Sequence, residues 1–285
     1  MANILVAGAS GRVGQAVIYE LQQHNHLIRA LVRNQAKLGN VTVNDVLRAD
    51  ARDPVKLAGA CEGIEVVISA LGGSLQLGRT ERNATYWDVD YQANKNLLAE
   101  AKRARVRKFI YISAFKANEV KGSAYFAAHA AFEAELQSSG MEYAIVRPTG
   151  IYYIFEEFVK LARYGLMPLF GDGSAKTNPI DERDVAGICV DAIDAEQKVY
   201  DIGGPEVFTR REIGALCFKV LGKKSRFIKY PIGLMRWLIK PLRLFDQRLF
   251  DLMDFAILVN HTDAVAPRIG TQSLEKYLQH LTAGE

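Results

Sequence analysis

The sequence has few of the features that mark secreted, metal-binding or membrane-spanning proteins. Its 285 residues include three cysteines, Cys61, Cys189 and Cys217, whose wide separation matches neither a metal site nor a redox motif. We expect each to be a small buried apolar side chain in a reducing compartment. No run of about twenty uncharged apolar residues occurs, so we expect no transmembrane helix. Met1 leads almost directly into an apolar run, without the charged start of a signal peptide, and we expect a cytoplasmic protein.

The overall composition is that of a folded globular protein. Hydrophobic residues make up 49% of the chain and charged residues 24%, and the formal net charge is +4. A chain of this length can bury a large core, either as two domains or as one α/β domain with additions. The order of the segments must therefore decide the architecture.

The most informative segment is a glycine-rich turn near the start of the chain. An apolar run over residues 4–7 indicates a buried parallel strand, three glycines follow at intervals of three, and residues 15–23 have helical periodicity. This order is typical of a dinucleotide-binding site. Gly8 permits the tight turn, Gly11 lets a pyrophosphate approach the backbone, and Gly14 lets the helix pack on the strand. The alternative is an ordinary tight connection between a strand and a helix.

The end of the second expected strand, over residues 26–33, indicates which cofactor binds. Folds that take NAD usually place an acidic residue there to bind the ribose 2′-hydroxyl. This chain has Arg33, with no acid until Asp45. A guanidinium fork matches a 2′-phosphate, and Arg12 in the glycine turn can converge on the same group, assisted by Lys37. We expect NADP(H) to be preferred and keep NAD(H) as the alternative, in which the arginines are solvated surface charges.

Strands and helices then alternate along the first half of the chain. Helices are expected from Asp53 onward, over 84–104 and over 124–138, and a loop over 165–178 precedes a helix that Asp181 caps. The further strands are expected over residues 46–49, 65–70, 108–113, 142–147 and 199–202. This alternation predicts an α/β fold of the Rossmann type, a doubly wound parallel sheet with helices on both faces. The expected core covers residues 1–150 and 180–204. A smaller, mostly helical substrate or lid region covers 151–179 and 205–285.

Five segments occur in the order found in one large superfamily. They are residues 8–14, 90–94, 108–113, 139–148 and 180–186. With these the chain resembles the atypical and extended short-chain dehydrogenases/reductases, in particular the NAD(P)-binding proteins similar to nitrogen-metabolite repressors and isoflavone reductases. The superfamily includes reductases, dehydratases, epimerases and non-catalytic cofactor sensors, so the resemblance implies a fold and not one reaction.

The resemblance implies cofactor contacts at the carboxyl ends of the strands. The pyrophosphate and adenosine end would be held by Gly8, Ser10, Gly11, Arg12, Val13 and Gly14. Arg33 would hold the 2′-phosphate, and the adenine would be flanked by Asp50 and Ala51. The ribose would lie over Ala70, Leu71 and Gly72, and the nicotinamide beside Pro148, Thr149, Gly150 and Ile151.

The catalytic position departs from the superfamily pattern. The working pair there is a tyrosine and a lysine four residues later, where the phenol donates a proton and the ammonium lowers its pKa and binds the nicotinamide ribose. Here the tyrosine is Tyr125, but His129 stands in the lysine position. Either His129 binds the ribose or donates a proton itself, or catalysis is weakened. Ser113 is a further catalytic candidate, and Phe115 and Tyr152 are candidate substrate contacts. The alternatives are that Tyr125 is a pocket wall, His129 a helix histidine with its hydrogen bonds satisfied and Ser113 a strand-end hydroxyl bonded to the backbone. For Tyr152 the alternative is packing of the smaller region.

Positive charge is concentrated in residues 219–248. This segment has nine lysines and arginines and one acid, a net charge of +8, so the rest of the chain sums to −4. Residues 232–259 read as an amphipathic helix pair interrupted by Pro241. The first interpretation is a lid over the substrate site. The second is peripheral contact of 219–259 with an anionic membrane surface that collects a lipophilic substrate. Nucleic-acid binding is the weakest, since no recognition motif accompanies the charge, and we expect no nucleic-acid partner.

Together these observations favour an NADP(H)-dependent oxidoreductase. Its small-molecule substrate would be a hydrophobic compound with a carbonyl or a conjugated double bond, because Tyr125 is retained and residues 152–164 are rich in aromatic rings. A non-catalytic NADP(H)-binding sensor or assembly factor is the first alternative, suggested by His129. A sugar-nucleotide epimerase is the second, although it would be expected to keep the Tyr/Lys pair and NAD. The sequence indicates no metal site.

Overall fold

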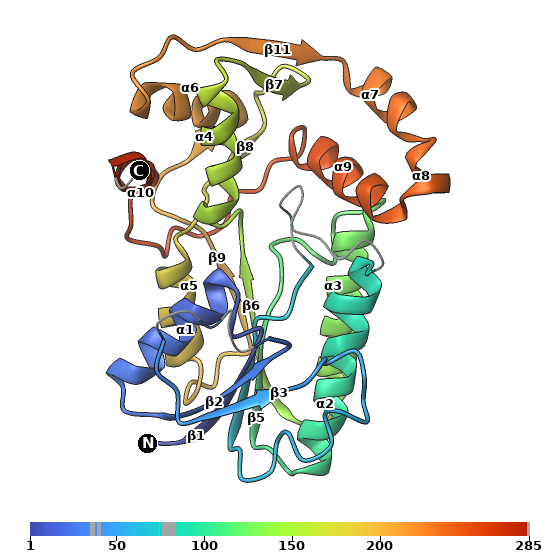
Figure 1. The fold of residues 1–285 in the computed structure, drawn as a ribbon, viewed down its shortest axis with the longest axis vertical. Coiled ribbons are helices and arrows are strands. Elements are labelled where there is room, and N and C mark those ends of the chain that lie inside the picture. The colour runs from blue at the N-terminus through green and yellow to red at the C-terminus, as the bar shows by residue number, and fades with distance from the viewer. Residues whose placement is uncertain (35–37, 39–40, 74, 76–83, 284–285) are drawn as a thin grey trace.

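A seven-stranded sheet forms the centre of the molecule in the computed structural model, which describes residues 1–34, 38, 41–73, 75 and 84–283 (Figure 1). Neighbouring strands are parallel, in the order β3-β2-β1-β4-β5-β6-β9. Their bounds are β1 Asn3–Ala7, β2 Leu27–Val32, β3 Asp45–Arg48, β4 Val66–Ser69, β5 Lys108–Ile112, β6 Glu142–Pro148 and β9 Val199–Ile202. The predicted doubly wound sheet is confirmed, and the strand order reverses beside β1, where such sheets bind ligands.

Helices cover both faces of the sheet, and their burial explains why the strands are continuously apolar. The helices α1 (Arg12–Gln23) and α5 (Glu182–Asp191) lie on one face, and α2 (Asn94–Arg103) and α3 (Ala124–Gln137) on the other (Figure 1). Along β1, Ile4 and Val6 pack into the α1/α5 core, whereas Leu5 and Ala7 pack into the α2/α3 core. Side chains alternate between the faces of a strand, so two buried faces require apolar residues at every position.

A second lobe covers the carboxyl edge of the sheet. Its elements are η3 Tyr152–Phe155, α4 Glu156–Arg163, β7 Met167–Phe170, β8 Lys176–Thr177, β10 Phe208–Thr209, α6 Arg210–Val220, β11 Phe227–Tyr230, α7 Ile232–Ile239, α8 Leu242–Phe245, α9 Gln247–Val259 and α10 Leu274–Ala283. Tyr152, Phe155 and Phe218 belong to a hydrophobic core of this lobe. Leu258 of α9 packs instead with Phe126 of α3, and this contact brings α9 over the amino end of α3.

Several local predictions were wrong, for identifiable reasons. The chain after Asp53 forms successive turns and not a helix, and two glycines with positive φ, Gly59 and Gly63, interrupt it. The helix expected over 84–104 starts as a π-helix, η2 (Trp87–Ala93), before it continues as α2. The expected loop over 165–178 contains β7 and β8, because β11 and β10 pair with them. The expected pair of helices over 232–259 is the three helices α7, α8 and α9.

The three cysteines are buried, as expected. Cys61, Cys189 and Cys217 are free and buried, and burial raises the pKa of each thiol to about 12. None of the helices in the described part of the chain is both long and apolar enough to span a membrane.

Candidate cofactor and active site

The three glycines of the turn between β1 and α1 have different geometric roles. Gly8 has a φ of +76°, and a Cβ there would lie 2.5 Å from the carbonyl oxygen of Ala70. A Cβ on Gly14 would lie 2.3 Å from the carbonyl oxygen of Gly8. At Gly11, by contrast, a Cβ would lie 3.3 Å from its nearest neighbour, and this residue is exposed. The fold itself therefore requires Gly8 and Gly14, whereas Gly11 keeps an exposed approach to the turn open.

The start of α1 fits the pyrophosphate of a dinucleotide. Gly11 is the N-cap and has no side chain that could accept hydrogen bonds from the first turn, which contains Arg12, Val13 and Gly14 and no acid. The N–H groups and the positive dipole of this helix end are thus available to an anion. Ser10 and Val13 are half-buried beside the turn.

Arg12 is directed toward the second lobe. Its guanidinium forms an ion pair with the carboxylate of Glu156 at the start of α4 and lies 3.5 Å from the hydroxyl of Tyr277 in α10. Tyr277 also donates a hydrogen bond of 2.9 Å to Glu156. Glu182 at the start of α5 lies 3.4 Å from the same hydroxyl, and burial raises its pKa. Arg12 is therefore bound to a carboxylate that a phosphate could replace.

Arg33 and Asp50 lie at the expected adenosine end. Arg33 follows β2 and is exposed. Hydrogen bonds from Arg52 lower the pKa of Asp50, and the positive charge of Arg33 adds to this effect. Ala51 is buried, and its carbonyl accepts a hydrogen bond from a side chain of α2. The cofactor contacts of Arg33, Asp50 and Ala51 stay predictions, and Lys37 lies outside the described residues.

The segments that follow β4 and β6 form the edge over which the ribose and nicotinamide are expected. Ala70 and Leu71 are half-buried, and Gly72 is exposed. Hydrogen bonds to two neighbouring segments hold residues 148–151. The carbonyl of Pro148 accepts a hydrogen bond of 2.9 Å from the backbone N–H of Phe115, and the hydroxyl of Thr149 donates one of 2.5 Å to the carbonyl of Asn178. Phe115 is half-buried. A rigid backbone at this edge suits the positioning of a flat ring.

Tyr125 and His129 share one face of α3, as their spacing predicts, with ring centroids 4.5 Å apart. His129 is buried. Its Nδ1 lies 2.5 Å from the hydroxyl of Tyr111, and its Nε2 lies 3.2 Å from Oδ1 of Asp90. The angle of the second contact does not make a hydrogen bond, so within the described structure Nε2 and Oδ1 are buried polar atoms without a hydrogen-bond partner. The imidazole therefore belongs to the interior of the protein.

Tyr125 is half-buried at the amino end of α3. Its ring packs edge-on against Tyr86 at 5.3 Å and against Phe255 of α9 at 4.7 Å between centroids. Burial raises the pKa of Tyr125 well above that of a free tyrosine, and the carboxylate of Asp90 adds to this shift. The phenol therefore keeps its proton at physiological pH.

Ser113 and Tyr152 already take part in internal hydrogen bonds. The hydroxyl of Ser113 donates to Glu133 at 2.5 Å, and Glu133 also accepts from Arg147 at 2.9 Å. Tyr152 is fully buried, and its hydroxyl donates to the carbonyl of Gln272 at 2.6 Å. These contacts favour the packing alternative for both residues.

The structure adds residues to the site that the motifs did not single out. The pKa of Tyr153 is raised to about 12 by burial and by the charges of Glu182 and Asp90, while Arg12 lowers it. The hydroxyl of Tyr153 is thus influenced by charges from the glycine turn and from the surroundings of His129. In the sequence, Tyr153 was marked only by the many aromatic residues that follow β6. Asp90 stands in one of the family segments, which is where a search for it could have begun.

A pocket of about 500 Å³ opens beside Tyr125, between η2, the start of α3 and the α8–α9 region. Trp87 and Phe250 supply aromatic walls, and Arg243, Asp251 and Asp254 supply charge. Burial raises the pKa of both aspartates. The other residues that line this pocket are Thr85, Gly122, Ala124 and Gln247. Its aromatic walls suit a flat ligand, and Ala124, the neighbour of Tyr125 in the chain, lines it.

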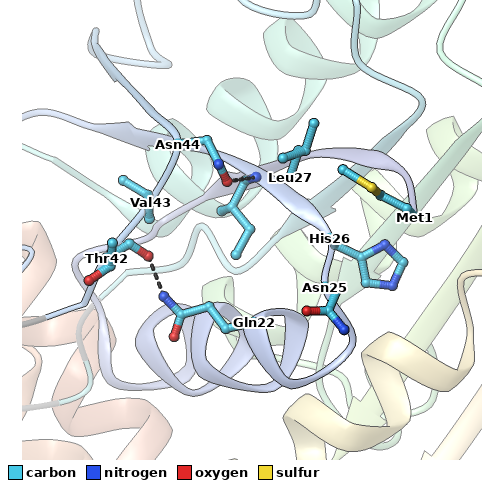
Figure 2. A pocket seen from close by; sticks show the side chains of 9 residues that line it. Met1, Gln22, Asn25, His26, Leu27, Thr42, Val43 and Asn44 are labelled. Carbon is cyan, nitrogen blue, oxygen red and sulfur yellow. Dashed lines mark hydrogen bonds between the residues drawn. The ribbon is translucent and has the colours of Figure 1, made fainter.

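Another pocket, of about 510 Å³, lies where α1 ends and β2 begins (Figure 2). The side chains of Met1, Gln22 and His26 line it, and Asn44 accepts a hydrogen bond of 2.8 Å from the backbone at its edge. It lies at the amino end of β2, whereas cofactors of this fold bind at the carboxyl ends of the strands. We therefore do not assign it to the active site. Among the described residues no cluster of three or more metal-ligating side chains occurs.

Comparison with known proteins agrees with this geometry. The profile of an NAD(P)H-binding family matches residues 8–196. The chloroplastic divinyl chlorophyllide a 8-vinyl-reductase of Cucumis sativus is 32% identical over 263 residues, 83% of this chain and 61% of that protein. This chain thus spans about three fifths of the length of that relative. The photosystem II assembly factor Ycf39 of Trieres chinensis is 22% identical over 266 residues, 90% of this chain and 82% of that protein.

The fold is also that of a solved oxidoreductase. The NADPH-dependent quinone oxidoreductase QOR2 of Escherichia coli, complexed with NADPH, has a TM-score of 0.75 and 22% identity, over 98% of this chain and 99% of that chain. The resemblance to atypical short-chain dehydrogenases/reductases is confirmed at the level of fold and family. With its matched glycine turn, parallel sheet and α5, this chain belongs to the NAD(P)H-binding family.

Proposed function

We propose that the protein is an NADPH-dependent reductase that acts on a conjugated carbon–carbon double bond of a flat, hydrophobic substrate. The preference for NADPH is supported by Arg33, which stands where NAD-binding folds usually have an acid. The choice of a conjugated double bond over a carbonyl is supported by the likeness to a vinyl-reductase. The bound cofactor supplies a hydride to one carbon of the double bond, and the other carbon requires a proton.

The observation that carries the proposal is the position of Tyr125, which stands where the family has its catalytic tyrosine and shares one face of α3 with His129. Its phenol would be the proton source that a reductase requires, and its raised pKa keeps it protonated. A reductase needs such a donor, whereas an epimerase or an alcohol dehydrogenase needs a base in the same place. The environment of Tyr125 therefore favours reduction over the epimerase alternative.

His129 acts on Tyr125 as a positioning residue in this proposal. Its ring contacts the Tyr125 ring at one edge, its Nδ1 lies 2.5 Å from the hydroxyl of Tyr111, and its Nε2 lies 3.2 Å from the carboxylate of Asp90. Its burial favours this role over direct binding of the nicotinamide ribose. The substrate would lie in the pocket between Trp87 and Phe250, which has a volume typical of small-molecule sites.

A cofactor-binding assembly factor without turnover is the second candidate. The missing ammonium at residue 129 favours it, and so does the likeness to an assembly factor. Both candidates would bind NAD(P)H, so a binding assay does not distinguish them. Only the reductase would consume NADPH in the presence of a suitable acceptor.

The test is reduction of divinyl chlorophyllide a, and of a simple quinone as an alternative acceptor, with NADPH consumption followed by absorbance. Tyr125→Phe removes the phenolic proton but keeps the ring, and we expect it to lower kcat by about a hundredfold or more without changing NADPH affinity. Tyr19→Phe, on the exposed face of α1, is the matched control and should keep full activity. Tight NADPH binding without turnover of either acceptor, in the wild type and in His129→Lys, would refute the reductase and support the assembly factor.

A further inference from the structure

The helices α7 and α8 lie at the outer edge of the second lobe (Figure 1). They expose large apolar side chains. Trp237 is 65% exposed, Leu244 84% and Phe245 87%, and about half of Leu234 and of Leu238 is exposed. Isolated apolar side chains are common on protein surfaces, but five large ones within twelve residues form a patch that indicates a contact.

The two faces of α7 show that this exposure is organised. Ile232, Met235 and Ile239 form the inward stripe, with Ile239 buried and the other two half-buried. Leu234 and Trp237 lie on the opposite face with Leu238, at the spacing that places residues side by side on a helix. A surface helix normally turns polar residues outward. The outward stripe of α7 is apolar, so it is suited to an apolar environment outside the molecule.

Basic side chains accompany this stripe. Arg236 and Lys240, one helical turn apart, lie on the same flank of α7 between its inward and outward stripes, and both are exposed. Both belong to the segment 219–248 with its net charge of +8. A helix that lies in a lipid headgroup region typically has tryptophan, phenylalanine and leucine on one face and lysine and arginine beside them. Its apolar side chains insert between the lipids, and its cations contact anionic headgroups.

We infer that α7 and α8 dock the protein on the surface of an anionic lipid bilayer. A second copy of this chain fits the patch less well, because a twofold contact would bring two segments of charge +8 together. The docking does not depend on the proposed reductase activity. It does place a pocket at the bilayer, since Arg243 of α8 lines the pocket beside Tyr125. A lipophilic ligand could then reach that pocket without crossing water.

The first test is flotation of the full chain with vesicles of phosphatidylcholine alone or with about a third phosphatidylglycerol. We expect flotation with the anionic vesicles only, and less of it as salt is raised. Arg236→Gln with Lys240→Gln should weaken binding about fivefold per charge removed. Leu244→Ser with Phe245→Ser should weaken it at least about tenfold.

Matched controls remove exposed apolar side chains elsewhere. Val55→Ser with Tyr19→Ser changes residues that are 80% and 58% exposed and lie outside the second lobe, and should leave flotation unchanged. Because all substituted side chains are exposed, each variant should keep the thermal stability of the wild type. In a Trp87→Phe background Trp237 is the remaining tryptophan, and its emission should shift to the blue with anionic vesicles and be quenched by brominated lipid.

Three outcomes would overturn the inference. One is no flotation with either kind of vesicle. Another is flotation that the α7 and α8 variants and the control variants share to the same degree. The third is self-association in solution that Leu244→Ser with Phe245→Ser abolishes, without vesicle binding, which would assign the patch to a second copy.

Discussion

Glu156→Gln tests whether Arg12 is a pyrophosphate ligand that Glu156 holds in the free protein. The two side chains form an ion pair whose members are 47% and 17% exposed. Pairs this close to solvent contribute about 0.2–1 kcal/mol, and 1.4 kcal/mol is about a tenfold change in affinity. The variant removes the carboxylate that competes with the pyrophosphate for Arg12. NADPH should therefore bind about two- to fivefold more tightly.

The assay is a titration with NADPH and with NADH, followed by nicotinamide fluorescence. Both cofactors carry the pyrophosphate, so the affinity for both should increase to the same degree. In an Arg12→Met background the gain should disappear, because no guanidinium is left to be released. Glu157→Gln is the matched control. Glu157 accepts a hydrogen bond of 2.7 Å from Lys160, not from Arg12, so this substitution should leave the affinities for both cofactors unchanged.

Three results would contradict this reasoning. Unchanged or weaker NADPH binding in Glu156→Gln would show that the ion pair does not compete with the cofactor. A gain that persists without Arg12 would be a long-range charge effect. A gain confined to NADPH would move Arg12 from the pyrophosphate to the 2′-phosphate, beside Arg33.

Four further substitutions separate the fold from the cofactor site. Gly14→Ala places a methyl group against the backbone of the turn and should destabilise the protein by about 3 kcal/mol in thermal unfolding, whereas Gly11→Ala should keep stability within about 1 kcal/mol and weaken NADPH binding. Arg33→Ala should weaken NADPH about tenfold or more and leave NADH unchanged in the same titration, with Arg105→Ala on the loop before β5 as control. Glu182 has a raised pKa in the folded protein, so its stabilising contribution is complete below its unfolded pKa and is lost as pH rises through the folded value. Glu182→Gln should therefore raise the melting temperature at pH about 7 and change it little at pH about 4.

The sheet and the cofactor edge could be predicted from the sequence because their signals are local. A strand buried on both faces is a short apolar run, and the turn after β1 requires Gly8 and Gly14 at set positions. The partner of Arg12 could not be predicted in this way. Glu156 lies 144 positions away, and nothing in either local sequence records that the second lobe folds back over α1.

The same distinction explains the misread segments. The chain after Asp53 has an N-cap residue and apolar positions, but Gly59 and Gly63 take a backbone conformation that ends each turn before a helix can grow. β7 and β8 have little strand character of their own and are strands because β11 and β10 lie beside them. In both cases tertiary pairing or backbone freedom outweighed local propensity.

His129→Lys tests the interpretation that the histidine makes Tyr125 a donor only. At present burial and, after it, the carboxylate of Asp90 raise the pKa of Tyr125, and no ammonium opposes them at residue 129. A lysine there would reach Asp90, neutralise its field and stabilise the phenolate, so the pKa of Tyr125 should fall. The rate of reduction by the wild type should then stay constant up to a pH of about 9, whereas the variant should lose rate within that range as its phenol titrates. A wild-type rate that already falls below pH about 9, with the fall absent in Tyr125→Phe, would mean that the pKa of Tyr125 is not raised and that it can act as a base.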